Sequence, residues 1–367
     1  MLYLSSLSAL TILSCSSPNQ TQPQSNIITK NDKLDLQANG NEPPKTTNSL
    51  NTDENKVKKD SIASSNEPKV KFLSIFDDLD GRMFLSSDGK RLATLGYKSS
   101  IYDLGSNRLL SRFPDFGSMS GSAVAMSPDW QTMAVGQISS GILIRDVQNG
   151  EILRSLPINV QNERAMTYSN KSSNILFAGS RDGSVQAFDV STGKVLNSIE
   201  YGKSEVKDIV LDSIQNRFLA VNYLFNGVVV WELSGQNVKS TVLTVPNSGT
   251  AISLSPDGSF LAIGYYEGLI KVYSIRSRLM IYETQPEIGH SVQALKFSPD
   301  SKYLLSGHYS EGFRVWEANT GKLLQRIKIG QGAGIASETV SQIEFSPNGT
   351  LLFTDGDSLI NIWKFQN

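Results

Sequence analysis

The stretch that decides the fold is "SLSPDGSFLAIGYYEGLIKVYSI", residues 253–275. An apolar run meets a Pro-Asp-Gly turn, the short apolar segment "FLAIG" follows, and a Glu-Gly turn leads into the alternating run "LIKVYSI". Turn residues between apolar runs of this length, together with alternation of apolar and polar residues, are typical of antiparallel hairpins. The stretch therefore predicts β-strands, and it contains no convincing helical period.

The same pattern recurs along the chain. Anchors of Ser-Pro-Asp-Gly type begin at residues 86, 127, 169, 212, 255, 298 and 346, so neighbouring anchors are 41 to 48 residues apart. Repeats of about 43 residues with four strands each are the signature of a β-propeller, and seven copies predict an all-β, seven-bladed ring. A second anchor, an aromatic and then an acidic residue in its best copies, keeps this period at Tyr102-Asp103, Arg145-Asp146, Phe188-Asp189, Trp231-Glu232, Tyr273-Ser274, Trp316-Glu317 and Trp363-Lys364.

The ends of the repeat array predict how the ring closes. The seventh unit stops at "LINIWKFQN", residues 359–367, which is its third strand. Before the first unit lies "KVKFLSIF", residues 69–76, an apolar segment of strand length. We expect this N-terminal strand to pair with the last blade, because the pairing leaves no open sheet edge there.

The sixth unit, "GHSVQALKFSPDSKYLLSGHYSEGFRVWEANTG", resembles a WD40 repeat, and the resemblance extends over residues 70–367. It implies a divergent seven-bladed propeller of WD40 type. It also implies a structural hydrogen-bond network made by His290, Ser306 and Trp316, because a buried imidazole needs partners for both ring nitrogens. His290 is therefore interpreted as a residue that stabilises the blade rather than as a general base. Other units have an apolar residue where Ser306 stands, as at Val135, Val221 and Ile263.

Composition excludes several classes of function. With 39% hydrophobic residues and a net charge of -1, the chain can bury a large core and lacks the basic excess of a nucleic-acid binder. One cysteine and two histidines are too few for a disulfide framework or a structural zinc site. We expect no metal and no cofactor, although Asp355 and Asp357 leave a calcium loop as the alternative to an ordinary turn. No Gly-x-Ser-x-Gly nucleophile motif occurs, so the sequence predicts no catalytic residue.

The N-terminal region predicts a membrane anchor. "MLYLSSLSALTILSC", residues 1–15, has an apolar run too short to span a bilayer and of the length found in signal peptides. Its end, "ILSC", resembles a bacterial lipobox, which implies a lipid on Cys15 and a place in the bacterial cell envelope. Residues 16–69 are polar enough to be a disordered tether with a root-mean-square span of about 40 Å. Plain secretion and a cytoplasmic location remain the alternatives.

The resemblance places one set of loops on a single face of the ring around the central channel. Aromatic residues gathered there with few charges are typical of protein-contact centres. We therefore expect a monomeric, non-catalytic scaffold that binds a protein or peptide partner through this face. The alternatives are a propeller enzyme or sensor with a small ligand or metal in its channel, and a subunit of an outer-membrane assembly complex. The expected contact residues are Tyr201, Tyr223, Phe225, Tyr265, Tyr266, His308, Tyr309 and Arg181, with Tyr97 and Arg164 completing the rim.

Overall fold

A computed structural model gives the architecture of residues 68–77, 81–95, 99–106, 108–113, 123–137, 141–158, 165–201, 203–234, 237–247, 249–284, 290–329, 338–356 and 359–366. The predictions of a signal peptide, of lipidation at Cys15 and of a tether lie outside these residues, apart from the last two positions of the tether. All the secondary-structure elements assigned within these residues are β-strands. None of the described segments is a helix long and apolar enough to cross a membrane.

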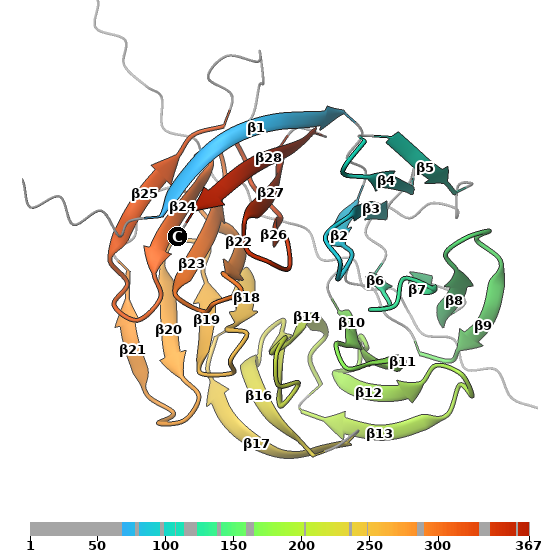
Figure 1. Cartoon of the computed structure of the whole chain (residues 1–367). Coiled ribbons are helices and arrows are strands. Elements are labelled where there is room, and N and C mark those ends of the chain that lie inside the picture. Colours follow the sequence, from blue (N-terminus) through green and yellow to red (C-terminus); the bar gives the residue numbers. More distant parts are fainter. Residues whose placement is uncertain are drawn as a thin grey trace, which may run out of the picture. The chain divides into compact units, whose positions relative to one another are not determined.

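Within the described residues, the strands form seven antiparallel sheets of four strands each, arranged as blades around a centre (Figure 1). The first strand of each blade lies nearest the centre. Blades 1 to 3 comprise β2 (Arg82–Leu85), β3 (Arg91–Leu95), β4 (Ser100–Asp103) and β5 (Arg108–Arg112); β6 (Val124–Met126), β7 (Thr132–Gln137), β8 (Gly141–Asp146) and β9 (Ile152–Leu156); and β10 (Met166–Ser169), β11 (Ser172–Gly179), β12 (Ser184–Asp189) and β13 (Val195–Glu200).

The remaining blades repeat this order, and blade 7 takes its fourth strand from the start of the described chain. Blades 4 to 7 comprise β14 (Val206–Leu211), β15 (Phe218–Tyr223), β16 (Gly227–Ser234) and β17 (Asn237–Val245); β18 (Ala251–Leu254), β19 (Phe260–Gly264), β20 (Ile270–Ser274) and β21 (Met280–Glu283); β22 (Val292–Phe297), β23 (Tyr303–His308), β24 (Phe313–Glu317) and β25 (Leu323–Ile327); and β26 (Ile343–Phe345), β27 (Leu351–Gly356), β28 (Leu359–Gln366) and β1 (Lys69–Asp77).

The ring closes between β1 and β28, which confirms the closure predicted from the sequence. The two strands pair antiparallel from Lys69 opposite Gln366 to Asp77 opposite Leu359. The ring of Phe72 meets the ring of Trp363 edge to face, with 5.3 Å between their centroids. Both ends of the repeat array thus belong to one sheet (Figure 1).

The repeating Ser-Pro-Asp anchors are turn braces between the first and second strands of a blade. In blade 5, the hydroxyl of Ser255 donates to the carboxylate of Asp257 over 2.6 Å and accepts from the backbone N–H of Phe260 over 2.9 Å. Ser298 and Asp300 repeat this arrangement in blade 6. One serine–aspartate pair therefore provides hydrogen-bond partners for the polar groups of the turn. This explains why the motif occurs once in most blades.

Neighbouring blades pack closely because glycines stand at or next to the ends of several second strands. A Cβ built on Gly264 would lie 2.4 Å from Cγ1 of Val292 in the next blade, and a Cβ on Gly307 would lie 2.7 Å from Cγ1 of Val340. Only glycine leaves room for these contacts without displacing a strand. The inner strands are consequently fixed against one another, and the turns that follow the second strands have a firm base.

Candidate functional site

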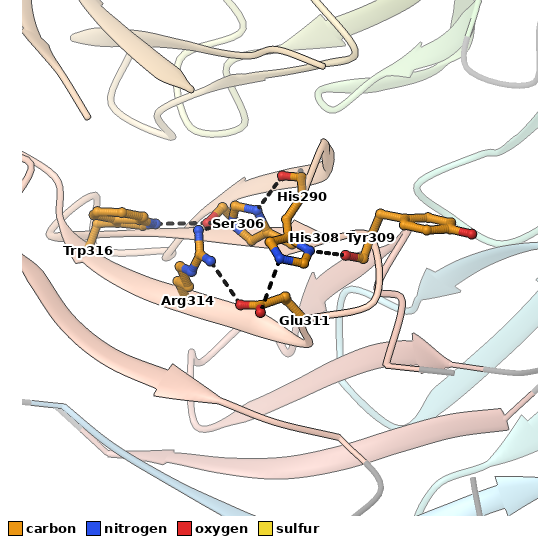
Figure 2. Close-up of polar contacts among 7 residues, drawn as sticks. All are labelled: His290, Ser306, His308, Tyr309, Glu311, Arg314 and Trp316. Atoms are coloured by element: carbon orange, nitrogen blue, oxygen red, sulfur yellow. Dashed lines mark hydrogen bonds and ion pairs between the residues drawn. The ribbon is translucent and has the colours of Figure 1, made fainter. Parts of the chain in front are cut away.

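A series of hydrogen bonds connects Trp316, Ser306, His308 and His290 in blade 6 (Figure 2). The indole Nε1 of Trp316 donates to the hydroxyl of Ser306 over 2.8 Å, and that hydroxyl lies 2.7 Å from Nε2 of His308. Nδ1 of His308 lies 3.3 Å from the carbonyl oxygen of His290. Because a carbonyl oxygen can only accept, Nδ1 carries the hydrogen and Nε2 accepts from Ser306. Each donor in the series thus has an acceptor.

The structure changes the roles predicted for the two histidines. His308 is 0% exposed, so the expectation that it touches a partner is wrong. The expectation that His290 bonds with Ser306 is also wrong, because the imidazole next to the Ser306 hydroxyl is that of His308, whereas the ring of His290 lies against Tyr309 and Glu311. His308 lies two residues after Ser306 in β23, and side chains two apart in a strand share one face. This spacing of two residues was the sequence signal for the actual pair.

Other blades have the network in part. In blade 7, Nε1 of Trp363 donates to the hydroxyl of Thr354 over 3.0 Å. In blade 4, Val221 occupies the position of Ser306, and Nε1 of Trp231 is buried without a hydrogen-bond partner among the described residues. The apolar residue that the sequence shows at this position therefore deprives the indole of its acceptor.

Charged groups surround the outer end of the blade 6 network (Figure 2). The guanidinium of Arg314 is buried, and its Nη2 lies 3.1 Å from Oε2 of Glu311 while its Nη1 lies 3.5 Å from Nε2 of His308. The other carboxylate oxygen of Glu311 lies 3.3 Å from Nε2 of His290. Nδ1 of His290 lies 3.2 Å from the carbonyl oxygen of Tyr309. The turn after β23 is therefore connected to His290, which lies two residues before β22.

Three aromatic side chains from consecutive blades stand out into solvent. Phe225 is 81% exposed, Tyr266 is 76% exposed and Tyr309 is 55% exposed. They occupy the turns between the second and third strands of blades 4, 5 and 6. Because every blade repeats the same strand order, these turns lie on the same face of the ring. We call Phe225, Tyr266 and Tyr309 the aromatic face.

The other residues predicted for this face differ in exposure. Tyr223 is fully buried, and the prediction that it contacts a partner is wrong: its ring lies 5.3 Å from that of Tyr201, and burial raises the pKa of its phenol. Tyr201 and Tyr265 are half-buried, and Nζ of Lys271 lies 5.6 Å from the ring centroid of Tyr265. Arg181 is exposed in the corresponding turn of blade 3. Tyr97 and Arg164 lie outside the described residues.

Comparison with known proteins gives a family for this arrangement. The profile of the family described as "Nucleolar protein 10-like, N-terminal domain", a β-propeller, matches residues 82–359. The chain belongs to this family. It is also 26% identical over 162 residues to autophagy-related protein 16 of Arabidopsis thaliana, a match that covers 44% of this chain and 30% of that protein. The match thus spans less than a third of that relative's length.

The centre of this nucleolar protein 10-like propeller contains a cavity of about 160 Å³ between the first strands of several blades. Its charged lining residues include Arg82, Lys296 and Glu344, and Nζ of Lys296 lies 2.7 Å from Oε2 of Glu344. Asp208 also lines the cavity, so two of its four charged side chains neutralise each other within the lining.

The calcium alternative concerned Asp355 and Asp357. The carboxylate of Asp355 accepts from the backbone N–H groups of Ser341 over 2.7 Å and of Gln342 over 2.8 Å, so it braces the start of the blade 7 sheet. Asp357 lies outside the described residues. Among the residues that the structure does describe, no three His, Cys, Asp or Glu side chains gather as metal ligands would.

Proposed function

We propose that this chain is a non-catalytic scaffold that binds a protein or peptide partner through the aromatic face. The observation that carries the proposal is the exposure of Phe225, Tyr266 and Tyr309 at corresponding turns of three consecutive blades. A large aromatic side chain in water is a cost to a folded protein, and it contributes strongly to binding when a partner covers it. Three of them on one face therefore favour a contact surface.

The support beneath the aromatic face also favours binding. The backbone N–H of Phe225 donates to the hydroxyl of Ser204 over 3.0 Å, and the N–H of Tyr309 donates to the carbonyl oxygen of Ser291 over 3.0 Å. Both turns are thus tied to the connection that enters their own blade. A surface held in place in this way loses little conformational entropy when a partner binds.

Crosslinking and co-purification test the proposal. Full-length protein would be compared with a variant carrying Phe225→Ala, Tyr266→Ala and Tyr309→Ala, with crosslinked partners quantified by mass spectrometry. Ile152→Ala is the matched control, because Ile152 is also 55% exposed but lies in the outer strand β9. We expect the triple variant to lose a specific partner about tenfold or more and the control to keep it. Equal recovery of partners by the parent and the triple variant would contradict the proposal.

We propose in addition that Cys15 is lipidated and anchors the propeller to a bacterial envelope membrane. The support is the sequence "ILSC" after an apolar run of signal-peptide length. Cys15→Ala should move the full-length protein from the membrane fraction to the soluble fraction. Metabolic labelling with a fatty acid gives a second readout, and a labelled Cys15→Ala variant that stays on membranes would show that the anchor is elsewhere.

A further inference from the structure

We propose that the outer edge of blades 7 and 1 contacts an anionic lipid surface through lysines of blade 7 and leucines of the outermost strands. This surface is distinct from the aromatic face, and its residues have no part in the proposed binding of a protein partner. The choice of a membrane as the occupant rests in part on the proposed lipidation of Cys15. The contact is therefore tested on protein that lacks the lipid.

Three lysines lie on one face of the blade 7 sheet. Lys71 of β1 is directly opposite Lys364 of β28, and Lys69 lies two residues before Lys71, so the three side chains share that face. All three are exposed. We call Lys69, Lys71 and Lys364 the lysine rim. Like charges directly opposite each other on neighbouring strands destabilise a sheet, and an anionic surface that covers them relieves this repulsion.

The lysine rim borders the junction between blades 7 and 1 (Figure 1). Ile360 and Ile362 occupy alternate positions of β28 before Lys364, and they pack in one apolar cluster with Tyr102 of blade 1. Lys364 therefore belongs to the face of β28 that is turned toward blade 1. In blade 1, Leu109 of β5 lies opposite Tyr102 in the strand pairing and is 44% exposed. The lysine rim and Leu109 thus approach the same junction from its two sides.

Exposed leucines stand at the bulges of both outermost strands. Leu73 is the extra residue of β1 and is 47% exposed, and Leu110 is the extra residue of β5 and is 54% exposed. Leu153 and Ile281 hold the corresponding positions in blades 2 and 5. Apolar bulges are therefore a repeated feature of the ring, and the location of the lipid contact follows from the lysine rim beside Leu73 and Leu110.

The lysine rim is available to anionic groups. Its three lysines form no ion pair with any residue that the structure describes, and the lysines that do form such pairs belong to blades 5 and 6. Arg108 of β5 is exposed and lies opposite Asp103 in the strand pairing. Asp103 accepts from the N–H and the hydroxyl of Ser106 over 2.7 Å each, so its own turn engages this carboxylate.

The mixture of ammonium groups and leucines favours a lipid surface over other anions. An anionic bilayer places phosphate groups above acyl chains, so it provides partners for lysines and for leucines that lie side by side. A nucleic acid backbone offers the charge without the apolar layer. Lysine side chains also reach upward from an apolar surface, because their long stems are apolar and their ends are charged.

The order of the chain favours the same occupant. Residues 1–67 join the described part of the chain at Pro68, directly before Lys69. Blade 7 is thus the blade to which the chain connects first after Cys15. A lipid on Cys15 would keep the lysine rim close to the membrane, and the rim would add a second, weaker attachment.

Vesicle flotation tests the contact. The probe is full-length Cys15→Ala protein mixed with vesicles of phosphatidylcholine alone or of phosphatidylcholine with phosphatidylglycerol. We expect binding to the anionic vesicles that weakens as salt is raised from about 0.1 M to about 1 M, because the screening length falls from about 10 Å to about 3 Å. Combined Lys69→Gln, Lys71→Gln and Lys364→Gln should lower the partition coefficient for anionic vesicles about tenfold or more.

A matched triple variant separates the lysine rim from net charge. Combined Lys171→Gln, Lys194→Gln and Lys203→Gln removes the same charge from exposed lysines in blade 3 and the connection after it. This variant should bind the anionic vesicles nearly as well as the parent, and thermal melts should show both triple variants folded. No flotation with anionic vesicles, equal losses in the two triple variants, or capture of an acidic protein by the lysine rim without flotation would overturn the proposal.

Leu110→Ser tests the apolar part of the contact. It should lower the partition coefficient about fivefold or more, because a leucine side chain no longer enters the lipid. Ile281→Ser is the matched control, since Ile281 stands at the corresponding bulge of blade 5 and is 40% exposed. Equal effects of the two substitutions would contradict a contact at blades 7 and 1. Because the probe has no lipid on Cys15, these results are independent of whether Cys15 is lipidated and of any partner of the aromatic face.

Discussion

At Ser306 the chain places one hydroxyl between two groups that each need a partner, an indole N–H and an imidazole nitrogen. A buried donor left without an acceptor costs about 1–3 kcal/mol. Blade 4 is the opposite case: Val221 has no hydroxyl, and the buried N–H of Trp231 has no hydrogen-bond partner among the residues that the structure describes. A single side chain therefore decides whether the tryptophan of a blade stabilises it fully.

Val221→Thr should stabilise the protein by about 1 kcal/mol, because threonine has the shape of valine and brings a hydroxyl to the indole of Trp231. The measurement is the free energy of unfolding from denaturant titration. Val230→Thr is the matched control, since Val230 is equally buried but packs in the apolar cluster of Val228 and Leu243. There the hydroxyl should destabilise the protein. Equal effects of the two substitutions on the free energy of unfolding would mean that the indole of Trp231 gains no hydrogen bond from the new hydroxyl.

A second residue-scale prediction concerns Asp189. The hydroxyl of Ser191 and the N–H of Thr192 bind its carboxylate, and they lower its pKa to about 2. Because the folded state lowers this pKa below the ordinary value of about 3.9, the carboxylate contributes stability above pH 4. That contribution is lost as the pH falls toward 2. Asp189→Asn should therefore reduce Tm at pH 7 and make progressively less difference in thermal melts between pH 4 and pH 2.

At the scale of the element, the strand ends decide how closely two blades approach. Gly264 ends β19, and the inner strand of the next blade begins with Val292, whose side chain fills the space above the glycine. Gly307 and Val340 repeat the contact one blade later. The packing of two sheets thus requires glycine at this position, and the requirement is not evident from either sheet alone.

Gly264→Ala should destabilise the protein by about 1–3 kcal/mol, because the added Cβ would lie 2.4 Å from Cγ1 of Val292. The double variant Gly264→Ala, Val292→Ala should recover part of this loss by making room for the methyl group. Chemical denaturation of the two variants measures the difference. If the double variant lost more unfolding free energy than the two single variants lose together, the close contact would not be the cause of the destabilisation.

The elements differ in how far the sequence predicts them. The Ser-x-Asp turns are predictable because Ser255, Asp257 and the N–H groups they bind lie within six residues of one another. The contacts of His290 are not predictable from that local pattern, because they depend on how β22 and β23 pair and on a turn that returns to the start of the blade. The contact of His308 with Ser306, by contrast, follows from their spacing of two residues in β23. The burial of Tyr223 beside the exposed Phe225 has a similar origin, since Tyr223 still belongs to strand β15.

At the scale of the whole molecule, ring closure joins residues almost 300 positions apart in the sequence. The period of the repeats and the incomplete seventh unit predict this closure, because a propeller without its last strand has an open edge. The partner, by contrast, is not predictable from a period. Recognition of the partner depends on which turns carry exposed aromatic residues, and the repeat pattern does not predict which turns these are.

Phe72→Ala tests the closure. Removing the edge contact with Trp363 should cost about 1 kcal/mol, and the loss should appear as faster hydrogen exchange in both β1 and β28. Leu73→Ala is the matched control, since Leu73 is similarly exposed on β1 at the irregular point of the strand pairing. Faster exchange in β1 alone would show that the two strands do not stabilise each other.

The measurement that tests the central claim most directly is hydrogen exchange of the full-length protein with and without the partner recovered by crosslinking. The account predicts that the partner slows exchange in the turns of Phe225, Tyr266 and Tyr309. It predicts no change in the Ser-x-Asp turns at the other ends of the second strands in blades 5 and 6. Protection of the Ser-x-Asp turns, with exchange at the aromatic face unaltered, would contradict it.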